Sequence, residues 1–120
     1  MSSFFRSFGY AFEGIVYAVR TQRNMRVHLA ITAIVIVAGL YFRISAVEWA
    51  VITVTVGLVL GTELTNTLAE LAVDLLTQRY HPMAKVAKDV GAGAVLITAI
   101  AAVFVGIAIF GPRLAALFRP

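Results

Sequence analysis

The chain contains no cysteine among its 120 residues. This absence excludes disulfides, cysteine-ligated zinc, iron–sulfur clusters and thiol nucleophiles, although it does not identify the redox compartment. Charged residues are also scarce, at 13%, whereas 61% of the residues are hydrophobic. Because soluble domains are closer to half apolar, this composition predicts a single-domain integral membrane protein.

Several familiar sequence signatures are missing as well. The chain has no GxxxxGK[ST] loop, no HRD or DFG motif and no Rossmann GxGxxG, because Gly91 and Gly93 open an apolar run instead of following a strand. Neither histidine belongs to a zinc-ligand spacing. No aromatic-and-basic nucleic-acid motif is visible, so no nucleic-acid partner is expected.

Apolar periodicity predicts an all-α membrane protein with four segments. Residues 1–22 place apolar side chains at spacings of three and four among charges, which predicts an amphipathic helix on the bilayer surface that is not a cleaved signal peptide. Packing of this helix on the bundle is the alternative. Transmembrane helices are expected at 27–44, 47–76 and 90–111, and a polar cytoplasmic loop is expected at 77–89. Gly57 and Gly61 form a GxxxG pair, which is typical of close helix packing.

The distribution of Lys and Arg predicts the orientation in the membrane. With the amino terminus and the 77–89 loop inside, seven cations are cytoplasmic, namely Arg6, Arg20, Arg23, Arg26, Arg79, Lys85 and Lys88. Only three lie outside, namely Arg43, Arg113 and Arg119. The positive-inside rule therefore places the end of the second membrane helix in the cytoplasm, where ATP is found.

A stripe of polar residues runs along that second helix. Glu63, Asn66, Glu70 and Asp74 are separated by three, four and four residues, so they share one helix face. An ionised side chain at the bilayer centre costs roughly 2.5 to 3.5 kcal/mol, which disfavours a lipid-facing position. At 1.5 Å per residue from Val47, Glu63 lies about 24 Å along the helix and Glu70 about 10 Å further. The stripe therefore crosses the boundary between membrane and water, where an enzyme joining a lipid to a soluble reagent would work.

Three kinds of function are compatible with this stripe. Phosphoryl transfer needs a metal carboxylate, cations around the phosphates and a group that deprotonates the acceptor hydroxyl, and the stripe with the neighbouring cationic loop offers all three. A small ion or proton channel or transporter would instead use an intramembrane carboxylate to carry its ion. A structural assembly subunit does not require the carboxylates at all.

The stripe also carries a family resemblance. The pattern E-x-x-N-[ST]-x-x-E-x-x-x-D over residues 63–74, followed by Ala87-Lys88-Asp89, resembles the small bacterial membrane kinases that phosphorylate diacylglycerol or undecaprenol. The resemblance covers nearly the whole chain. It implies a homotrimeric helical bundle in the bacterial cytoplasmic (inner) membrane, with active sites at the cytoplasmic interface that use Mg²⁺, ATP and a membrane lipid alcohol.

The resemblance also implies roles for individual residues. The glutamate matching Glu63 is the catalytic base in that family, and the glutamate matching Glu70 binds the metal. Residues that match the nucleotide site are Tyr10, Arg79, Tyr80, His81, Lys88 and Asp89. Residues that match supporting positions are Asn66 and Asp74.

The chain departs from the family pattern at Gln22. Family members often carry a second metal-binding and nucleotide-binding glutamate there, whereas a glutamine carbonyl ligates Mg²⁺ without formal charge. A metal role and a purely structural role for Gln22 both stay open. Asn24, Arg26 and His28 follow the N-x-R-x-H order of the undecaprenol-kinase branch more than that of the enterobacterial diacylglycerol-kinase branch, which points to undecaprenol as substrate. Arg26 and His28 are the candidates for lipid binding, and a role as an orientation charge is the alternative for Arg26. For His28, a position capping the membrane interface is the alternative.

Overall fold

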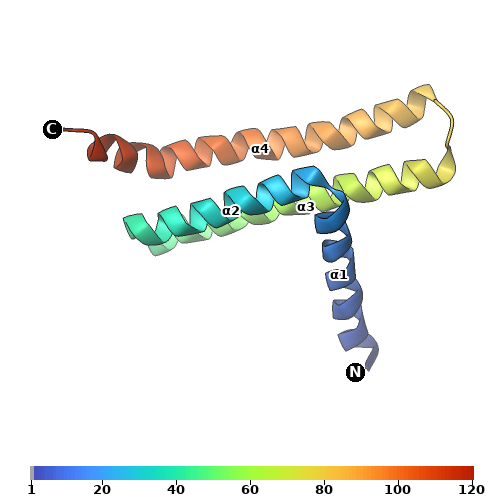
Figure 1. Cartoon of the computed structure of the whole chain (residues 1–120), viewed down its shortest axis with the longest axis horizontal. Coiled ribbons are helices and arrows are strands. Elements are labelled where there is room, and N and C mark those ends of the chain that lie inside the picture. Colours follow the sequence, from blue (N-terminus) through green and yellow to red (C-terminus); the bar gives the residue numbers. More distant parts are fainter. Residues whose placement is uncertain (1) are drawn as a thin grey trace.

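The computed structural model describes residues 2–120 as four helices connected by short turns. These are α1 (Ser2–Thr21), α2 (Arg23–Phe42), α3 (Ala46–Leu76) and α4 (Pro82–Leu117). Figure 1 shows α2, α3 and α4 running alongside one another, whereas α1 turns sharply away from them. The prediction of an all-α protein is confirmed, and no strand occurs in residues 2–120.

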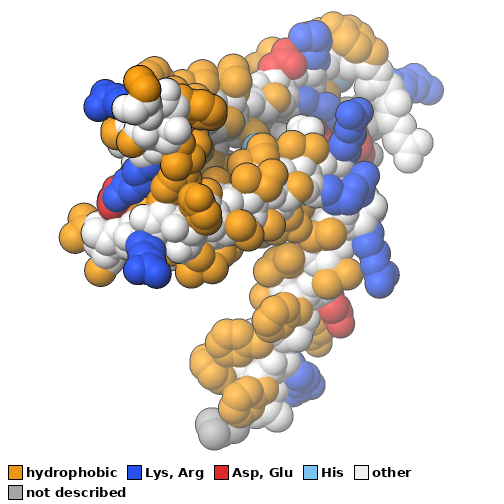
Figure 2. Space-filling view, turned by 60° about the vertical axis from the view of Figure 1, so that its left-hand side comes forward, with side chains coloured by type: hydrophobic (Ala, Val, Ile, Leu, Met, Phe, Trp, Pro, Cys, Tyr) orange, Lys and Arg blue, Asp and Glu red, His pale blue; other side chains and the backbone are white. Residues whose placement is uncertain are grey.

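Three of the helices have the length and composition of membrane spans. α2, α3 and α4 are each long and apolar enough to cross a bilayer. Figure 2 shows hydrophobic side chains covering most of their visible surface, with Lys and Arg gathered near the helix ends and where α1 joins the bundle. The prediction of an amino-terminal helix followed by three membrane spans is therefore confirmed.

The packed core lies at the end of the bundle remote from the α3–α4 turn. Its buried members come from the α2–α3 connection and from α3 and α4, and they are Ile44, Ile52, Ile109 and Phe110. Gly39 of α2 lies so close to the indole ring of Trp49 that a Cβ at this position would overlap the ring. The absence of a side chain at residue 39 therefore allows α2 to approach α3.

The same end of the bundle is closed by a capped helix start and an ion pair. Ser45 accepts a hydrogen bond from the backbone N–H of Glu48, and the Glu48 carboxylate accepts one from the N–H of Ser45, which forms a capping box for α3. Arg113 of α4 donates two hydrogen bonds of 2.7 Å to the same carboxylate. Such a bidentate pair fixes the relative position of α3 and α4 at this end.

Both ends of the last helix differ from the sequence-based expectation. The connection after α3 is confined to 77–81, and residues 82–89, expected in a loop, form the first turns of α4. The backbone N–H of Met83 donates to His81 Nδ1, and Pro82 stands at the first position, where its missing N–H costs nothing. The helix also continues past Pro112 to Leu117, because the proline removes one backbone hydrogen bond while the adjacent Arg113 holds that turn to α3.

Candidate active site

Glu63 is the most deeply buried charged side chain among residues 2–120. It lies in the middle of α3 and is 1% exposed. Its nearest ionisable neighbour is His28 of α2, whose Nε2 lies 3.6 Å from Glu63 Oε2. Within the described chain, Glu63 Oε2 has no hydrogen-bond partner. A buried carboxylate oxygen in this state is costly, and it is available to accept a hydrogen bond from a ligand hydroxyl.

Asn66 sets the register between α3 and α4 one turn further along. A Cβ at Gly91 would overlap the Asn66 side-chain oxygen, so any larger residue at this position requires the Asn66 amide to shift. The Asn66 Oδ1 atom is buried and has no hydrogen-bond partner in the described part of the protein. Glu63 and Asn66 therefore present two orphaned acceptors on the same helix face, as the spacing of the stripe predicts.

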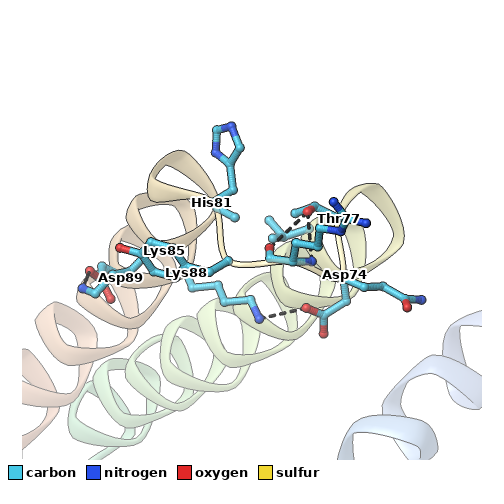
Figure 3. A pocket seen from close by; sticks show the side chains of 11 residues that line it. Asp74, Thr77, His81, Lys85, Lys88 and Asp89 are labelled. Carbon is cyan, nitrogen blue, oxygen red and sulfur yellow. Dashed lines mark hydrogen bonds and ion pairs between the residues drawn. The ribbon is translucent and has the colours of Figure 1, made fainter.

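A shallow polar pocket of about 520 Å³ lies at the tip of the α3–α4 hairpin. The pocket is lined by residues from the end of α3, the connecting turn and the first turns of α4, namely Val73, Asp74, Thr77, Gln78, Arg79, Tyr80, His81, Ala84, Lys85, Lys88 and Asp89. Lys88 donates to Asp74 across this pocket over 2.8 Å, as Figure 3 shows. The structure thus brings together five residues assigned to the nucleotide site with the supporting Asp74.

The side chains of this pocket point in different directions. Asp89 pairs with Lys85 at 2.7 Å along the exposed face of α4, and not with Lys88. His81 uses Nδ1 to cap α4, and its ring points away from the Lys88–Asp74 pair (Figure 3). Lys88 and Asp74 therefore form the ion pair that joins α3 to α4 in this pocket, whereas Lys85 and Asp89, which also line it, pair with each other along α4.

Glu70 lies between the buried carboxylate and the tip pocket. At 1.5 Å per residue it is about 10 Å along α3 from Glu63 and about 6 Å from Asp74. Its side chain is half-buried, and it forms no ion pair or hydrogen bond within residues 2–120. Glu63 itself is about 16 Å along the helix from Asp74, so it does not line the tip pocket. An unpaired carboxylate thus stands between the two ends of the stripe.

The remaining predicted residues belong to α1 and the start of α2. Tyr10 is 66% exposed on α1 and lines none of the pockets near Glu63 or the tip. Gln22 is the one non-helical residue between α1 and α2, and its side chain makes no capping hydrogen bond. The Arg26 guanidinium donates to the carbonyl oxygens of Val19 and Arg20, at 2.9 and 3.1 Å, so it closes the end of α1.

Two structural contacts near the site are not evident from sequence patterns. Thr62 and Thr98 share a hydrogen bond of 2.9 Å that joins α3 to α4 beside Glu63. Gly91 is needed for the close approach to Asn66, and the run of small residues after Asp89 was the one signal for it. An apolar cavity of about 320 Å³ also lies between α2, α3 and α4, with His28 at its border.

The class of protein follows from these features: a small all-helical membrane protein with a buried carboxylate that continues along one helix into a polar, cationic pocket. The family model described as prokaryotic diacylglycerol kinase matches residues 9–110. The chain therefore belongs to the prokaryotic diacylglycerol kinase family and is a lipid kinase. The channel alternative and the assembly-subunit alternative are set aside by this membership.

Named relatives agree with the family. The chain is 40% identical to an undecaprenol kinase of Bacillus subtilis, over 95% of this chain and 93% of the relative. It is 47% identical to a diacylglycerol kinase of Synechocystis, over 92% of this chain and 64% of that longer protein. A diacylglycerol kinase of Escherichia coli is 30% identical over 79% of this chain and 78% of its own length.

Proposed function

We propose that this lipid kinase transfers the γ-phosphoryl group of ATP to the hydroxyl of undecaprenol or diacylglycerol, with Glu63 as the general base. The observation that carries this proposal is the buried Glu63 oxygen without a hydrogen-bond partner in the described chain. An acceptor hydroxyl that donates to this oxygen is held where its proton can be removed. Both acceptor lipids are taken from the names of the relatives.

The chemistry assigned to Glu63 is a single proton transfer coupled to phosphoryl transfer. The hydroxyl proton moves to the Glu63 carboxylate as the acceptor oxygen forms its bond to the γ-phosphorus. The bond between that phosphorus and the bridging oxygen breaks, and ADP leaves. The apolar surroundings of Glu63 keep bulk water away from the phosphoryl group, which favours the lipid hydroxyl as acceptor over water.

The nucleotide is proposed to lie along the stripe between the tip pocket and Glu63. Lys88 and Arg79 supply positive charge for the phosphates, and Lys88 is already directed into the pocket. Tyr80, His81 and Asp89 line the same pocket, so contacts to the nucleoside are assigned to them. Tyr10 on α1 is proposed to close the site from the membrane surface.

The expected Mg²⁺ ion can be tested against the donor atoms present. Among residues 2–120 no three His, Asp or Glu side chains converge to form a ready-made metal cage. Mg²⁺ does not need one, because it usually retains several waters and is held by one or two carboxylates together with phosphate oxygens. The unpaired Glu70 fits that role, and Gln22 offers a neutral second oxygen. When bound, the ion neutralises charge on the β- and γ-phosphates.

We propose that the site lies at the cytoplasmic face of the inner membrane, and the excess of Lys and Arg in the segments assigned to that side supports this orientation. The exposed aromatic side chains of α1 support its location on the bilayer surface, since Phe4, Phe8 and Phe12 are each more than half exposed. A homotrimer is proposed as the working assembly. Gly57 and Gly61 have no atom within 4 Å of an added Cβ in this chain, which leaves room for a helix of another copy.

The proposed function is tested with purified protein in mixed micelles. The protein is incubated with γ-labelled ATP and Mg²⁺, and either diacylglycerol or undecaprenol is supplied in parallel. Label in the organic phase as a lipid monophosphate is the expected result, and the ratio of the two products identifies the preferred acceptor. Absence of labelled lipid with both acceptors would overturn the proposal.

A further inference from the structure

The environment of Glu63 contains one ionisable side chain from another helix. His28 of α2 places Nε2 at 3.6 Å from Glu63 Oε2, and its side chain is 17% exposed. The charged residues nearest in sequence to this contact on its own two helices are Glu70 on α3 and Arg23 and Arg26 on α2. The guanidinium of Arg26 is engaged by the α1 carbonyls, and α4 has no charged residue between Asp89 and Arg113.

The position of His28 is itself well fixed. Its carbonyl oxygen accepts a hydrogen bond of 2.7 Å from the Thr32 hydroxyl. Met25, one turn earlier on α2, is 2% exposed and holds this part of the helix against its neighbours. The imidazole therefore approaches the carboxylate from a constrained backbone, and this approach joins α2 to the reacting part of α3.

We propose that His28 is a positioning residue for Glu63: the N–H dipole at its Nε2, 3.6 Å from Oε2 and so beyond hydrogen-bond distance, attracts the carboxylate and orients it toward the acceptor hydroxyl, while Oε2 stays available to that hydroxyl. This inference rests on the proposed function, because it assumes that Glu63 is the base. A buried carboxylate with no partner has no fixed orientation and a high desolvation cost. A neighbouring N–H group orients the carboxylate and reduces that cost. This role differs from the lipid-headgroup contact expected from the sequence, since it acts through Glu63 and not through the lipid.

A spectroscopic experiment tests the contact without relying on activity. The chain has two histidines, His28 and His81, so ¹⁵N-histidine labelling gives two resolvable imidazole environments. Glu63→Gln is expected to shift the Nε2 signal of His28 and to leave the His81 signals, which come from the distant hairpin tip, unchanged. His28→Gln assigns the signals by removing one set. An unchanged His28 signal in Glu63→Gln would overturn the proposal.

A kinetic experiment tests the positioning role. His28→Leu is expected to lower kcat at least tenfold with the KM for ATP within twofold of wild type. His28→Gln, whose amide N–H lies about as far from the backbone as Nε2, is expected to recover most of the loss. Thr98→Val is the matched control. It removes the hydrogen bond from α4 to Thr62, the residue that precedes Glu63, and is expected to keep kcat within twofold of wild type.

The outcomes separate the two proposals. Wild-type turnover in His28→Leu, or equal losses in His28→Leu and His28→Gln, would overturn the positioning role while lipid phosphorylation by the wild-type protein leaves the proposed function standing. An equal loss in Thr98→Val would also overturn it, because any broken interhelical contact would then suffice. A wild-type protein that phosphorylates neither lipid would overturn the proposed function and this inference with it.

Discussion

Lys88 on α4 donates a hydrogen bond of 2.8 Å to Asp74 on α3, and this pair bridges the pocket at the tip of the hairpin. Both side chains remain substantially exposed, at 44% and 62%. An exposed pair of this kind adds little to folding stability, because water and salt screen the attraction. The pair holds an ammonium group in place in the pocket, ready for an anionic ligand.

Lys88→Ala is therefore expected to raise the KM for Mg-ATP about tenfold or more and to leave the melting temperature nearly unchanged, because a phosphate contact is lost while an exposed ion pair contributes little to stability. Nucleotide titrations and thermal unfolding in detergent measure the two effects. Arg119→Ala is the control, since it removes an exposed cation beyond the far end of α4 and leaves the residues of the tip pocket unchanged. Equal nucleotide titrations for Lys88→Ala and the wild type would remove Lys88 from the phosphate site.

Glu63→Gln is expected to reduce lipid phosphorylation by about 10² to 10⁴, the usual contribution of a general base. The amide has nearly the same shape as the carboxylate, so folding should be preserved and the melting temperature should confirm it. Glu13→Gln makes the same substitution on the exposed surface of α1 and is expected to retain activity. Turnover near that of the wild type in a well-folded Glu63→Gln protein would exclude Glu63 as the base.

Gly91→Ala is expected to destabilise the protein by about 1 to 3 kcal/mol, the usual cost of an overpacked contact, because the new methyl group would overlap Asn66. Activity should fall as well, since Asn66 lies one turn from Glu63. Gly93→Ala serves as the control on the same helix, where an added Cβ meets no atom within 4 Å. Chemical or thermal unfolding of both variants decides the matter, and equal stabilities would show that α3 and α4 do not meet closely at residue 91.

Gln22→Glu is expected to lower the Mg²⁺ concentration needed for half-maximal activity, because a carboxylate replaces a neutral oxygen in the proposed metal shell. Mg²⁺ titrations at saturating lipid measure the change. Thr21→Glu adds the same charge one residue earlier and is expected to have a smaller effect. Overlapping curves for wild type and Gln22→Glu would assign Gln22 a purely structural role at the junction of α1 and α2.

The apolar periodicity of the sequence predicted the helices. The polar face of α3 was predicted from the spacing of Glu63, Asn66, Glu70 and Asp74. It placed the start of α4 too late, because the exposed side chains of Lys85 and Lys88 interrupt the apolar pattern without interrupting the helix. The contact between His28 and Glu63 was not predictable, because it depends on how far α2 slides along α3. Such a register is set by packing between helices and not by periodicity within either one.

The length of α3 has a consequence for the choice of membrane. Its 31 residues measure about 46 Å, whereas the hydrocarbon layer is about 30 Å thick. In the proposed orientation, the end of α3 that carries the Glu48–Arg113 pair lies at the outer membrane surface, so the length of the helix sets the depth of Glu63 below the opposite headgroups. For Glu63 as the proposed base, we expect hydrophobic mismatch in bilayers of shorter or longer acyl chains to change how closely a lipid hydroxyl approaches the carboxylate.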